Sequence, residues 1–520
     1  MSGSRIARVV MMRELQTRQT IGLVGAMLLL TMVFSSPAAA EPAKMKNGLQ
    51  LIQERHRDRF REFSNELEKL AKGCDEKGLD KEAAQVRSRA IVVDSQSLRV
   101  DKLPAELRPE ISPKLTGDER HWQTQLRFLE TEYAKDLYVQ SRQALNKEYS
   151  GYAYNLIREA AIHNPDHPHV RKILGYVQLG NEWVTPFAHW QIKKGNVWNE
   201  EFGWLQKSQV EKYIAGERRF NDRWISAEKE KELRRDFSSA WEIRTEHYLI
   251  KTNVSLESGV EMGKALEEFY SVFIETFAGF FHSPEQLQKL FNDSAKQFRP
   301  ADKPPYKVHF YRTRDEYLER LRKFFPSIDQ TNGVYMTSDR IAHFYYDPNQ
   351  DHKGTLFHEA THQLFFESHF ANRTICENHH FWIIEGIACY MESFQQKNGA
   401  FSLGDPNYIR FTGARHNLLE LNYYVPLREF SGYGMQDFQT AQELAKNYTQ
   451  AAGLARFFMH HDKGRYREAL VKHLAQLYSK DERVRERVEG LDDLTGIDFT
   501  ELDRQYAEDA RQMDDQISSR

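Results

Sequence analysis

Cysteine is the residue that this sequence most nearly lacks, because its 520 residues contain only Cys74, Cys376 and Cys389. So few cysteines exclude a disulfide-rich scaffold, in which several bridges take the place of a large hydrophobic core. Two alternatives remain for Cys376 and Cys389. They form a single bridge in an oxidising compartment, or they are two buried free thiols.

An excess of basic residues is also missing. The whole chain carries a formal charge of −3, and removal of the first 40 residues leaves 68 basic and 74 acidic residues, a charge of −6. Proteins that bind nucleic acid through its phosphates need a basic patch or tail. We therefore expect no nucleic-acid partner.

Long hydrophobic runs are absent after the first 40 residues. The uncharged run 21–34 follows four arginines and precedes the small residues Ala38 and Ala40. This pattern predicts a signal peptide over residues 1–40, cleaved after Ala40. The alternative is a retained anchor, but 14 residues are fewer than the roughly 20 that span a bilayer. We expect an exported protein, periplasmic or secreted, with no membrane span after cleavage.

Residues 41–175 are expected to form a mainly helical region. Charged and apolar residues alternate at helical spacing over 51–72, where glycine and proline are rare. Over 137–179 the same spacing flanks the Pro-rich break 164–168, which ends one helix and begins another. This segment resembles one tetratricopeptide-like hairpin, and a single unit is not a repeat array.

Residues 176–235 contain a weak internal repeat built on tryptophan. Trp183, Trp204 and Trp224 are each followed by a β-branched or aliphatic residue and then a polar one. One interpretation is a small binding surface anchored by these tryptophans. The interpretation that we favour is a set of short elements, each attached to a shared core by one tryptophan, because tryptophan is usually buried.

The pattern changes after residue 235, and residues 236–520 are expected to form one α+β domain. Strands are predicted over 248–253 and 307–311, helices over 255–280 and 314–324, and a hairpin over 333–347 that turns at 337–340. From His352 onward the pattern is mainly helical. Strands mixed with helices and then followed by helices alone indicate an α+β fold.

The central motif is His358-Glu359-Ala360-Thr361-His362. Residues four apart project from one face of a helix, so two imidazoles can bind one metal ion. Glu359 lies about 100° around the helix from His358 and can act as a general base toward a water molecule that the metal acidifies. The alternative is a buried structural histidine pair, which requires hydrogen-bond partners.

A second segment supplies the third ligand. Glu385 lies 23 positions after His362, near the start of the apolar segment 382–392. A catalytic zinc ion needs three protein ligands and one open position, and Glu385 completes a His-His-Glu set. The alternative role of Glu385 is a surface or capping residue. The expected cofactor is Zn²⁺.

These two segments together resemble the gluzincin metallopeptidases, whose aminopeptidase members carry a comparable Trp-x-x-Glu-Gly-x-Ala-x-Tyr-x-Glu block at the position of 382–392. The segments 241–248 and 448–458 are similar to an uncharacterised exported bacterial family with a peptidase-like domain. The resemblance covers about residues 241–508. It implies a sheet whose edge strand flanks the active-site helix, followed by a helical lobe that carries the third ligand. It does not identify a substrate.

The sequence departs from that pattern in two places. The Gly-x-Met-Glu-Asn motif, with which aminopeptidases recognise a free substrate amine, is missing, so an endopeptidase or another hydrolase is favoured. Cys389 stands where some relatives place an aspartate that orients a ligand histidine. Glu392 is a candidate for that hydrogen bond.

A zinc hydrolase also needs a donor to the oxyanion that develops on the substrate. Tyr448 is the first candidate, both from the resemblance and because it opens an amphipathic helix. Tyr423, Tyr424 and Tyr433 are its rivals. His379 and His380 precede the segment of Glu385 and are expected to be exposed.

The sequence therefore predicts a zinc metallopeptidase that hydrolyses peptide bonds, with His358, His362 and Glu385 as metal ligands and Glu359 as general base. Its expected partner is a peptide or protein substrate. Two alternatives remain: a zinc-retaining but non-catalytic scaffold that binds peptide or cell wall, and a peptidoglycan amidase. The intact Glu359 argues against the scaffold. The oligomeric state is not specified by the sequence.

Overall fold

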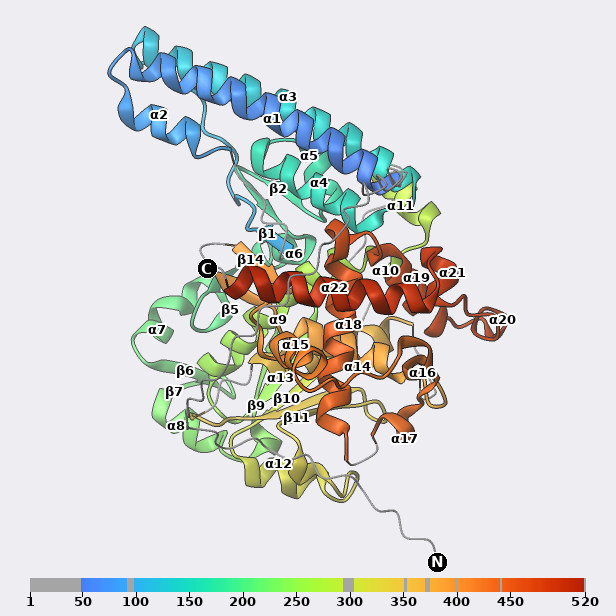
Figure 1. Cartoon of the computed structure of the whole chain (residues 1–520). Helices are drawn as coiled ribbons and strands as arrows, with labels where there is room; N and C mark the ends of the chain where they lie inside the picture. Colours follow the sequence, from blue (N-terminus) through green and yellow to red (C-terminus); the bar gives the residue numbers. More distant parts are fainter. Residues whose placement is uncertain are drawn as a thin grey trace, which may run out of the picture.

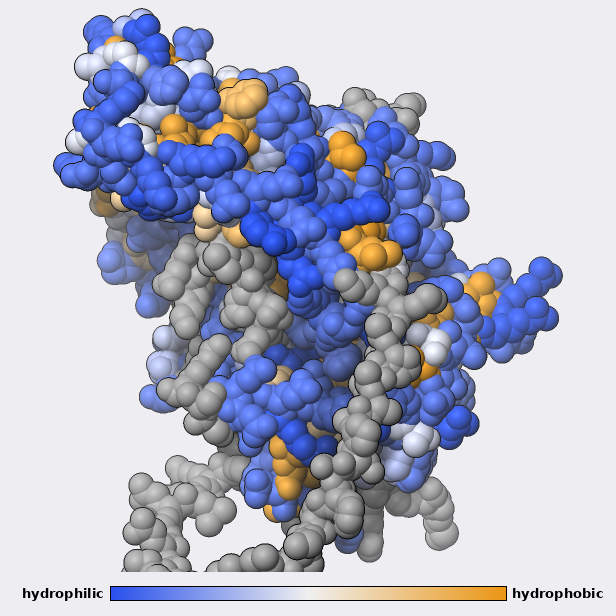
Figure 2. Space-filling model, turned by 45° about the horizontal axis from the view of Figure 1, so that its top comes forward, coloured by the Kyte–Doolittle hydropathy of each residue, from blue (hydrophilic) through white to orange (hydrophobic). Residues whose placement is uncertain are grey.

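A computed structural model describes residues 48–90, 98–292, 304–349, 353–369, 375–397, 400–439 and 442–518. The predicted signal peptide and its apolar run lie outside these residues. Within them, no helix combines the length and the apolar character needed to cross a membrane. The face seen in Figure 2 is mostly hydrophilic, with small and separate apolar patches.

The first region is helical, as expected, with one exception. Its elements are α1 (Gly48–Asp75), α2 (Asp80–Arg87), β1 (Leu98–Asp101), α3 (Gly117–Asn146), α4 (Ser150–His163) and α5 (Pro168–Ile173). Helices α1 and α3 lie side by side along the top of Figure 1 and bury an apolar core between them. Thr116 begins α3 with a capping box, in which its side chain and that of Glu119 satisfy backbone donors reciprocally.

The hairpin expected over 137–179 is wrong in its second half. The break at 164–168 does separate two helices, but α5 has only six residues, and β2 (Val177–Leu179) follows it. The long packed pair is α3 with α4. Their turn at 147–149 contains Glu148 in the left-handed region at φ 63°, without a glycine to signal it.

The tryptophan repeat consists of three hairpins, each followed by a short helix. The elements are β2 and β3 (Glu182–Val184) with α6 (Pro186–Lys193), β4 (Asn196–Asn199) and β5 (Gly203–Gln206) with η1 (Lys207–Gln209) and α7 (Val210–Ile214), and β6 (Glu217–Phe220) and β7 (Arg223–Ser226) with α8 (Ala227–Leu233). Trp204 contacts Phe187 of α6, and Trp224 contacts Tyr213 of α7. Each of these two tryptophans therefore packs on the helix of the preceding unit, as in a solenoid, and not on one shared core.

The domain that follows is α+β, with a mixed five-stranded sheet in the order β11-β12-β10-β9-β8. Its strands are β8 (Trp241–Arg244), β9 (Tyr248–Thr252), β10 (Tyr306–Tyr311), β11 (Gly333–Met336) and β12 (Ile341–Tyr345). Strands β9, β10 and β12 are parallel, while the edge strands β8 and β11 are antiparallel to their neighbours. The predicted hairpin 333–347 is confirmed.

Helices cover both faces of this sheet. On one face lie α9 (Leu256–Thr276) and α13 (Lys353–Ser368), packed on the apolar residues of alternate sheet positions. On the other face lies α12 (Arg314–Leu321), over a smaller core of eight buried residues. Short elements η2 (Phe237–Ser239), α10 (Ala278–Phe281), α11 (Pro284–Phe291) and η4 (Ile328–Gln330) connect these layers.

The last part of the chain is a helical lobe, as expected, interrupted by two strands. Its helices are α14 (Phe381–Met391), α15 (Ile409–Leu419), α16 (Leu427–Gly432), α17 (Met435–Phe438), α18 (Leu444–Gly464), α19 (Arg467–Leu477), α20 (Glu482–Arg485), α21 (Leu491–Thr495) and α22 (Phe499–Ser518). The strands β13 (Gln395–Lys397) and β14 (Ala400–Leu403) form a sheet with β1, about 300 positions earlier in the sequence. Strand β1 thus fixes the first helical region to this lobe.

A second link joins the same two parts of the molecule. The carboxylate of Glu468, in the first turn of α19, accepts a 2.8 Å hydrogen bond from the backbone N–H of Gly151 at the start of α4. Burial raises the pKa of Glu468 from 4.5 to about 7. The backbone N–H groups of residues 150–152 and the charge of Arg467 act in the opposite direction. The folded protein therefore binds a proton here more tightly than the unfolded chain does.

We predict a pH-dependent stability that Glu468→Gln removes. Because the folded pKa is raised, the contribution of Glu468 is fully present below pH 4.5 and is lost as the pH rises through about 7. Between pH 5 and pH 8, the melting temperature of the parent should therefore fall relative to that of Glu468→Gln. Thermal unfolding followed by circular dichroism measures this, with the exposed Glu66→Gln as control. An equal difference between parent and variant at both pH values would contradict the assignment.

Candidate metal centre

Helix α13 carries the central motif across the face of the sheet. Its buried residues include Leu356, Phe357, Ala360 and Leu364, which belong to the main apolar core and fix the helix on the sheet. Gly333 of β11 allows close packing, because a Cβ there would come within 2.9 Å of the Thr355 side chain. This anchoring leaves His358 and His362 on the opposite side, facing the helical lobe.

Helix α14 brings the third residue to them. Its sequence is apolar apart from Glu385, and all of its residues from Phe381 to Met391 are buried except Ile384. Gly386 lies against α18, where a Cβ would come within 2.6 Å of the carbonyl oxygen of Ala451. Only glycine permits this approach. The close contact of α14 with α18 thus sets the position of Glu385.

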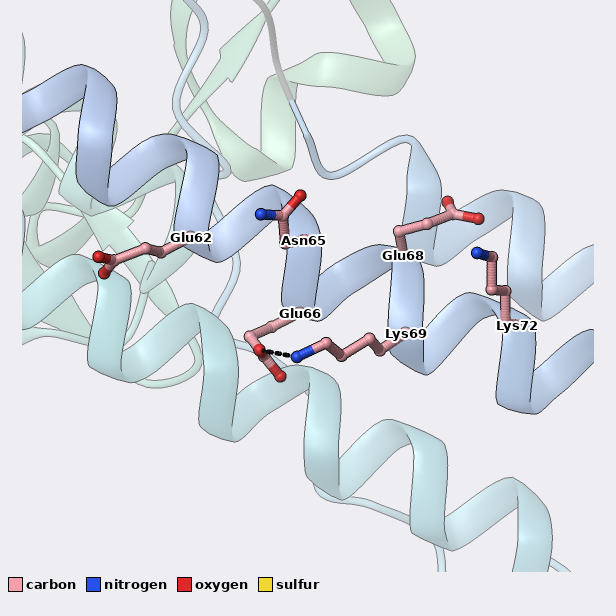
Figure 3. A pocket seen from close by; sticks show the side chains of 6 residues that line it. All are labelled: Glu62, Asn65, Glu66, Glu68, Lys69 and Lys72. Carbon is pink, nitrogen blue, oxygen red and sulfur yellow. Dashed lines mark hydrogen bonds and ion pairs between the residues drawn. The ribbon is translucent and has the colours of Figure 1, made fainter.

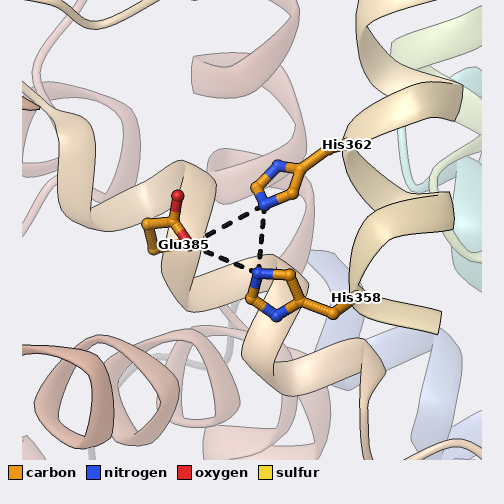
Figure 4. Close-up of side chains that lie close together, drawn as sticks. All are labelled: His358, His362 and Glu385. Carbon is orange, nitrogen blue, oxygen red and sulfur yellow. Dashed lines mark hydrogen bonds and ion pairs between the residues drawn. The ribbon is translucent and has the colours of Figure 1, made fainter. Parts of the chain in front are cut away.

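The side chains of His358, His362 and Glu385 converge on one point (Figure 4). The two Nε2 atoms are 3.1 Å apart, and Glu385 Oε2 lies 3.4 Å from Nε2 of His358 and 3.7 Å from Nε2 of His362. The edge of a tetrahedron with metal–ligand bonds of about 2.1 Å is about 3.4 Å long. The three atoms could therefore hold one metal ion. Each side chain is 10–19% exposed, so the point remains accessible.

Burial and charge act against each other at Glu385. Burial alone would raise the pKa of this carboxyl, but His362 and His358 hold it well below its ordinary value. Glu385 is therefore ionised at neutral pH, as a metal ligand must be.

Glu359 lies beside this cluster and is held by the edge strand. The backbone N–H of Tyr335 in β11 donates a 2.7 Å hydrogen bond to its Oε2. Burial raises the pKa of Glu359, while the neighbouring His358 and His362 oppose that rise. A carboxylate with a raised pKa is a stronger base than an exposed one. One of its oxygens is fixed by Tyr335, and no described residue donates to the other.

Glu392 contacts the remaining ring nitrogen of His358. Its Oε1 lies 2.8 Å from His358 Nδ1, while Arg410 donates to both carboxylate oxygens at 2.9 and 3.0 Å, and the Tyr408 hydroxyl donates at 3.1 Å. Burial alone would raise the pKa of Glu392, but His358 and Arg410 lower it to about 2. A charged Glu392 accepts the Nδ1–H of His358 and leaves Nε2 as the ligand atom.

The structure distinguishes Tyr448 from its three rivals. The hydroxyl of Tyr423 donates to Asn447, that of Tyr424 to Asp503 and that of Tyr433 to Glu429. The Tyr448 hydroxyl makes no hydrogen bond to a described residue and remains accessible to solvent. Burial raises the pKa of Tyr448 well above its ordinary value, and the charges of Glu385 and Glu359 raise it further. This neutral hydroxyl thus lies within electrostatic range of both carboxylates.

The other residues considered from the sequence supply no atom to the set of His358, His362 and Glu385. Cys376 and Cys389 are buried and form no disulfide, so the alternative with a bridge does not apply. Cys389 Sγ lies 4.0 Å from His358 Nδ1, and burial raises the pKa of its thiol. His379 is exposed, whereas His380 precedes α14 at φ 61° and packs on His379 and His473. The expectation that His380 is also exposed is wrong.

Three residues of the cluster were missed by sequence reasoning. Arg410 and Tyr408 hold Glu392, and Tyr335 holds Glu359. Arg410 and Tyr408 lie in a segment without a motif, so no local signal marks them. The alternating pattern of β11 predicted a strand, but not that Tyr335 donates its backbone N–H to Glu359.

Another hollow lies over α1, far along the sequence from this cluster, and is lined by Glu62, Asn65, Glu66, Glu68, Lys69 and Lys72 (Figure 3). All six residues belong to one helix, and Lys69 pairs with Glu66. Glu68 pairs with Arg87 of α2. An exposed, internally paired charged face of this kind is typical of a solvated helix, and it carries no catalytic group.

Comparisons with protein-family models, with curated proteins and with solved structures found no match for this chain.

We predict that Arg410→Met weakens metal binding about 10- to 100-fold, the usual effect of losing a residue that orients a metal ligand. Without the guanidinium, Glu392 loses the two donors that fix its carboxylate beside His358. Arg410→Lys should lie between parent and Arg410→Met, because lysine keeps the charge but not the planar fork. Competition with a zinc chelator measures the affinity. The exposed Arg428→Met is the control, and an affinity in Arg410→Met equal to that of the control would exclude this role.

Proposed function

We propose that this protein is a zinc-dependent hydrolase of the gluzincin type, most simply an endopeptidase. The observation that carries the proposal is the convergence of two imidazole nitrogens and one carboxylate oxygen, with a separate carboxylate, Glu359, fixed beside them. A structural zinc site is usually closed by four protein ligands, whereas a catalytic site has three and keeps one position open.

Zinc suits this donor set. Zinc ions in proteins bind histidine nitrogen and carboxylate oxygen at about 2.0–2.2 Å in tetrahedral geometry. Calcium and magnesium prefer six or more oxygen ligands. The hydrogen bond between Glu392 and His358 is the kind of contact that orients a zinc-binding histidine. When bound, zinc would lower the pKa of a water molecule and polarise a carbonyl group.

The residues around the metal position divide the remaining work. Glu359 accepts a proton from the attacking water and later passes it to the leaving amine, with Oε2 held by Tyr335. The Tyr448 hydroxyl donates to the negative charge that develops on the substrate carbonyl oxygen. Its raised pKa keeps it protonated and therefore able to donate.

The edge strand favours a peptide as substrate. Among the described residues, strand β11 pairs only with β12, and the Tyr335 N–H that reaches Glu359 points away from β12, toward the free edge. The backbone groups of alternate residues on that edge are available to an extended chain, which can add as a further strand. Such an addition would place a peptide bond beside Glu359.

We also propose that the protein acts after export, in the periplasm or outside the cell. The support is the charged, apolar and small-residue pattern of residues 1–40.

Glu359→Gln should retain about one zinc ion per chain and lose at least ~100-fold of the activity, in line with the contribution of a general base. Glu385→Ala should lose the metal itself. The measurements are elemental mass spectrometry of the chain from Glu41 and turnover of a peptide library. Glu367→Gln, two turns further along α13, is the matched control. A zinc-free parent, or a Glu359→Gln variant with normal turnover, is incompatible with the proposal.

Tyr448→Phe should lower kcat about 100-fold with little change in KM, because the lost hydrogen bond acts on the transition state. Tyr433→Phe is the control, since the Tyr433 hydroxyl is already bound to Glu429. Steady-state kinetics on one peptide substrate separates the two variants. Equal kcat values for Tyr448→Phe and Tyr433→Phe would remove Tyr448 from the mechanism.

A further inference from the structure

The far face of the five-stranded sheet carries a row of ionisable side chains. Lys251 of β9, His309 of β10 and His343 of β12 are direct neighbours in the strand register. Their sequence neighbours Ile250, Val308 and Ala342 belong to the core beneath α9 and α13. Because successive residues of a strand face opposite sides, this row faces away from the metal centre.

A broad cavity of about 1220 Å³ opens over this row and is lined by residues of the sheet, of α12 and of the end of α8. Lys251, His309 and His343 line it, together with Arg312 at the end of β10 and the ring of Phe237. It is separate from the hollow beside Glu392, with which it shares no lining residue.

A chain of hydrogen bonds holds the two histidines in place. Asp339 contacts His343 Nε2 at 3.3 Å, His343 Nδ1 lies 3.0 Å from the Tyr311 hydroxyl, and that hydroxyl lies 3.3 Å from His309 Nδ1. This series of hydrogen bonds ends at His309, whose Nε2 has no partner among the described residues. Burial, with His343 and Lys251 nearby, lowers the pKa of His309 to about 3.

Two basic side chains in the cavity have more N–H donors than the described residues have acceptors bound to them. The Arg312 guanidinium makes no hydrogen bond or ion pair with a described residue, and its Nε is fully buried. Lys251 has one ion pair, at 3.8 Å, to the exposed Glu242. A buried donor without a partner costs free energy unless a ligand or ordered water satisfies it.

Most of the acidic residues of the cavity are already engaged. Asp339 contacts His343, Glu316 binds Arg320 and Asn253, and Glu232 pairs with Lys229. Asp236 caps η2 through the N–H of Ser238. Asp315 and Glu319 are exposed on α12. The carboxylates therefore leave Arg312 without an ion-pair partner among the described residues, and Lys251 with the single pair to Glu242.

We propose that this cavity binds an oxyanion, a carboxylate or phosphate group, through Lys251 and Arg312 with His309 beside them. Arginine and lysine are the side chains that bind such groups most strongly, and Arg312 can present two parallel donors. The aromatic ring of Phe237, on the same wall, suits a ligand with an apolar portion next to the anionic group. This site does not depend on the metal centre.

Isothermal titration calorimetry with inorganic phosphate and, separately, with acetate tests the proposal, at constant ionic strength set by chloride. One anion should bind per chain, and Lys251→Met and Arg312→Met should each weaken binding at least about tenfold, as expected for a hydrogen bond to a charged group. Lys307→Met is the matched control. Lys307 lies on the same face of β10 as His309 but outside the cavity. A preference for phosphate or for acetate would identify the class of anion.

Binding at the metal centre is distinguished by repeating the titration with Glu385→Ala, in which the anion should still bind and still depend on Lys251 and Arg312. Arg312→Lys, which keeps the charge, serves if Arg312→Met fails to fold, as judged by its melting temperature. The nuclear magnetic resonance signals of the His309 ring should shift when the anion is added. Binding that is equal in parent, Lys251→Met and the Arg312 variant, or no binding of either anion above that of chloride, would overturn the proposal.

Discussion

The burial of charge on one apolar helix is the constraint on which the rest of the structure depends. Helix α14 is apolar apart from Glu385, and Glu392 follows directly at its end, with both carboxylates at most 10% exposed. A buried carboxylate is costly unless cations or donors surround it. The imidazoles of α13 and the guanidinium of Arg410 supply these partners. The packing of α13, α14 and α15 is therefore also the assembly of the candidate site.

The sequence identifies the parts of this site that a local pattern marks. His358, Glu359 and His362 are marked by their spacing, and Glu385 by being an acid in an apolar run. Arg410 and Tyr335 could not be found in this way, because their contacts depend on how distant segments meet. The same limit explains the strand β1, whose partner β14 lies about 300 residues away, and the turn at Glu148, which has no glycine or proline to mark it.

The two faces of the central sheet carry different chemistry because of the alternation of the strand. In β10, Val308 and Phe310 enter the core beneath the metal-centre helix, while His309 and Tyr311 face α12. A shift of register by one residue would exchange these sets and place ionisable groups in the main core. The apolar packing under α13 and the polar row on the far face therefore favour the same pairing register of the strands in the five-stranded sheet.

The first helical region is joined to the C-terminal helical lobe by backbone pairing. Strand β1 completes the sheet of β13 and β14. Only Ser393 and Phe394 separate Glu392 from the start of β13. Gln395 and Gln396 line the hollow that also contains Glu392 and Arg410. Displacement of β1 would free one edge of β14 and loosen the segment that leads away from Glu392. Strand β1 thus connects the first helical region, through the backbone pairing of β14 and β13, to the segment that follows Glu392.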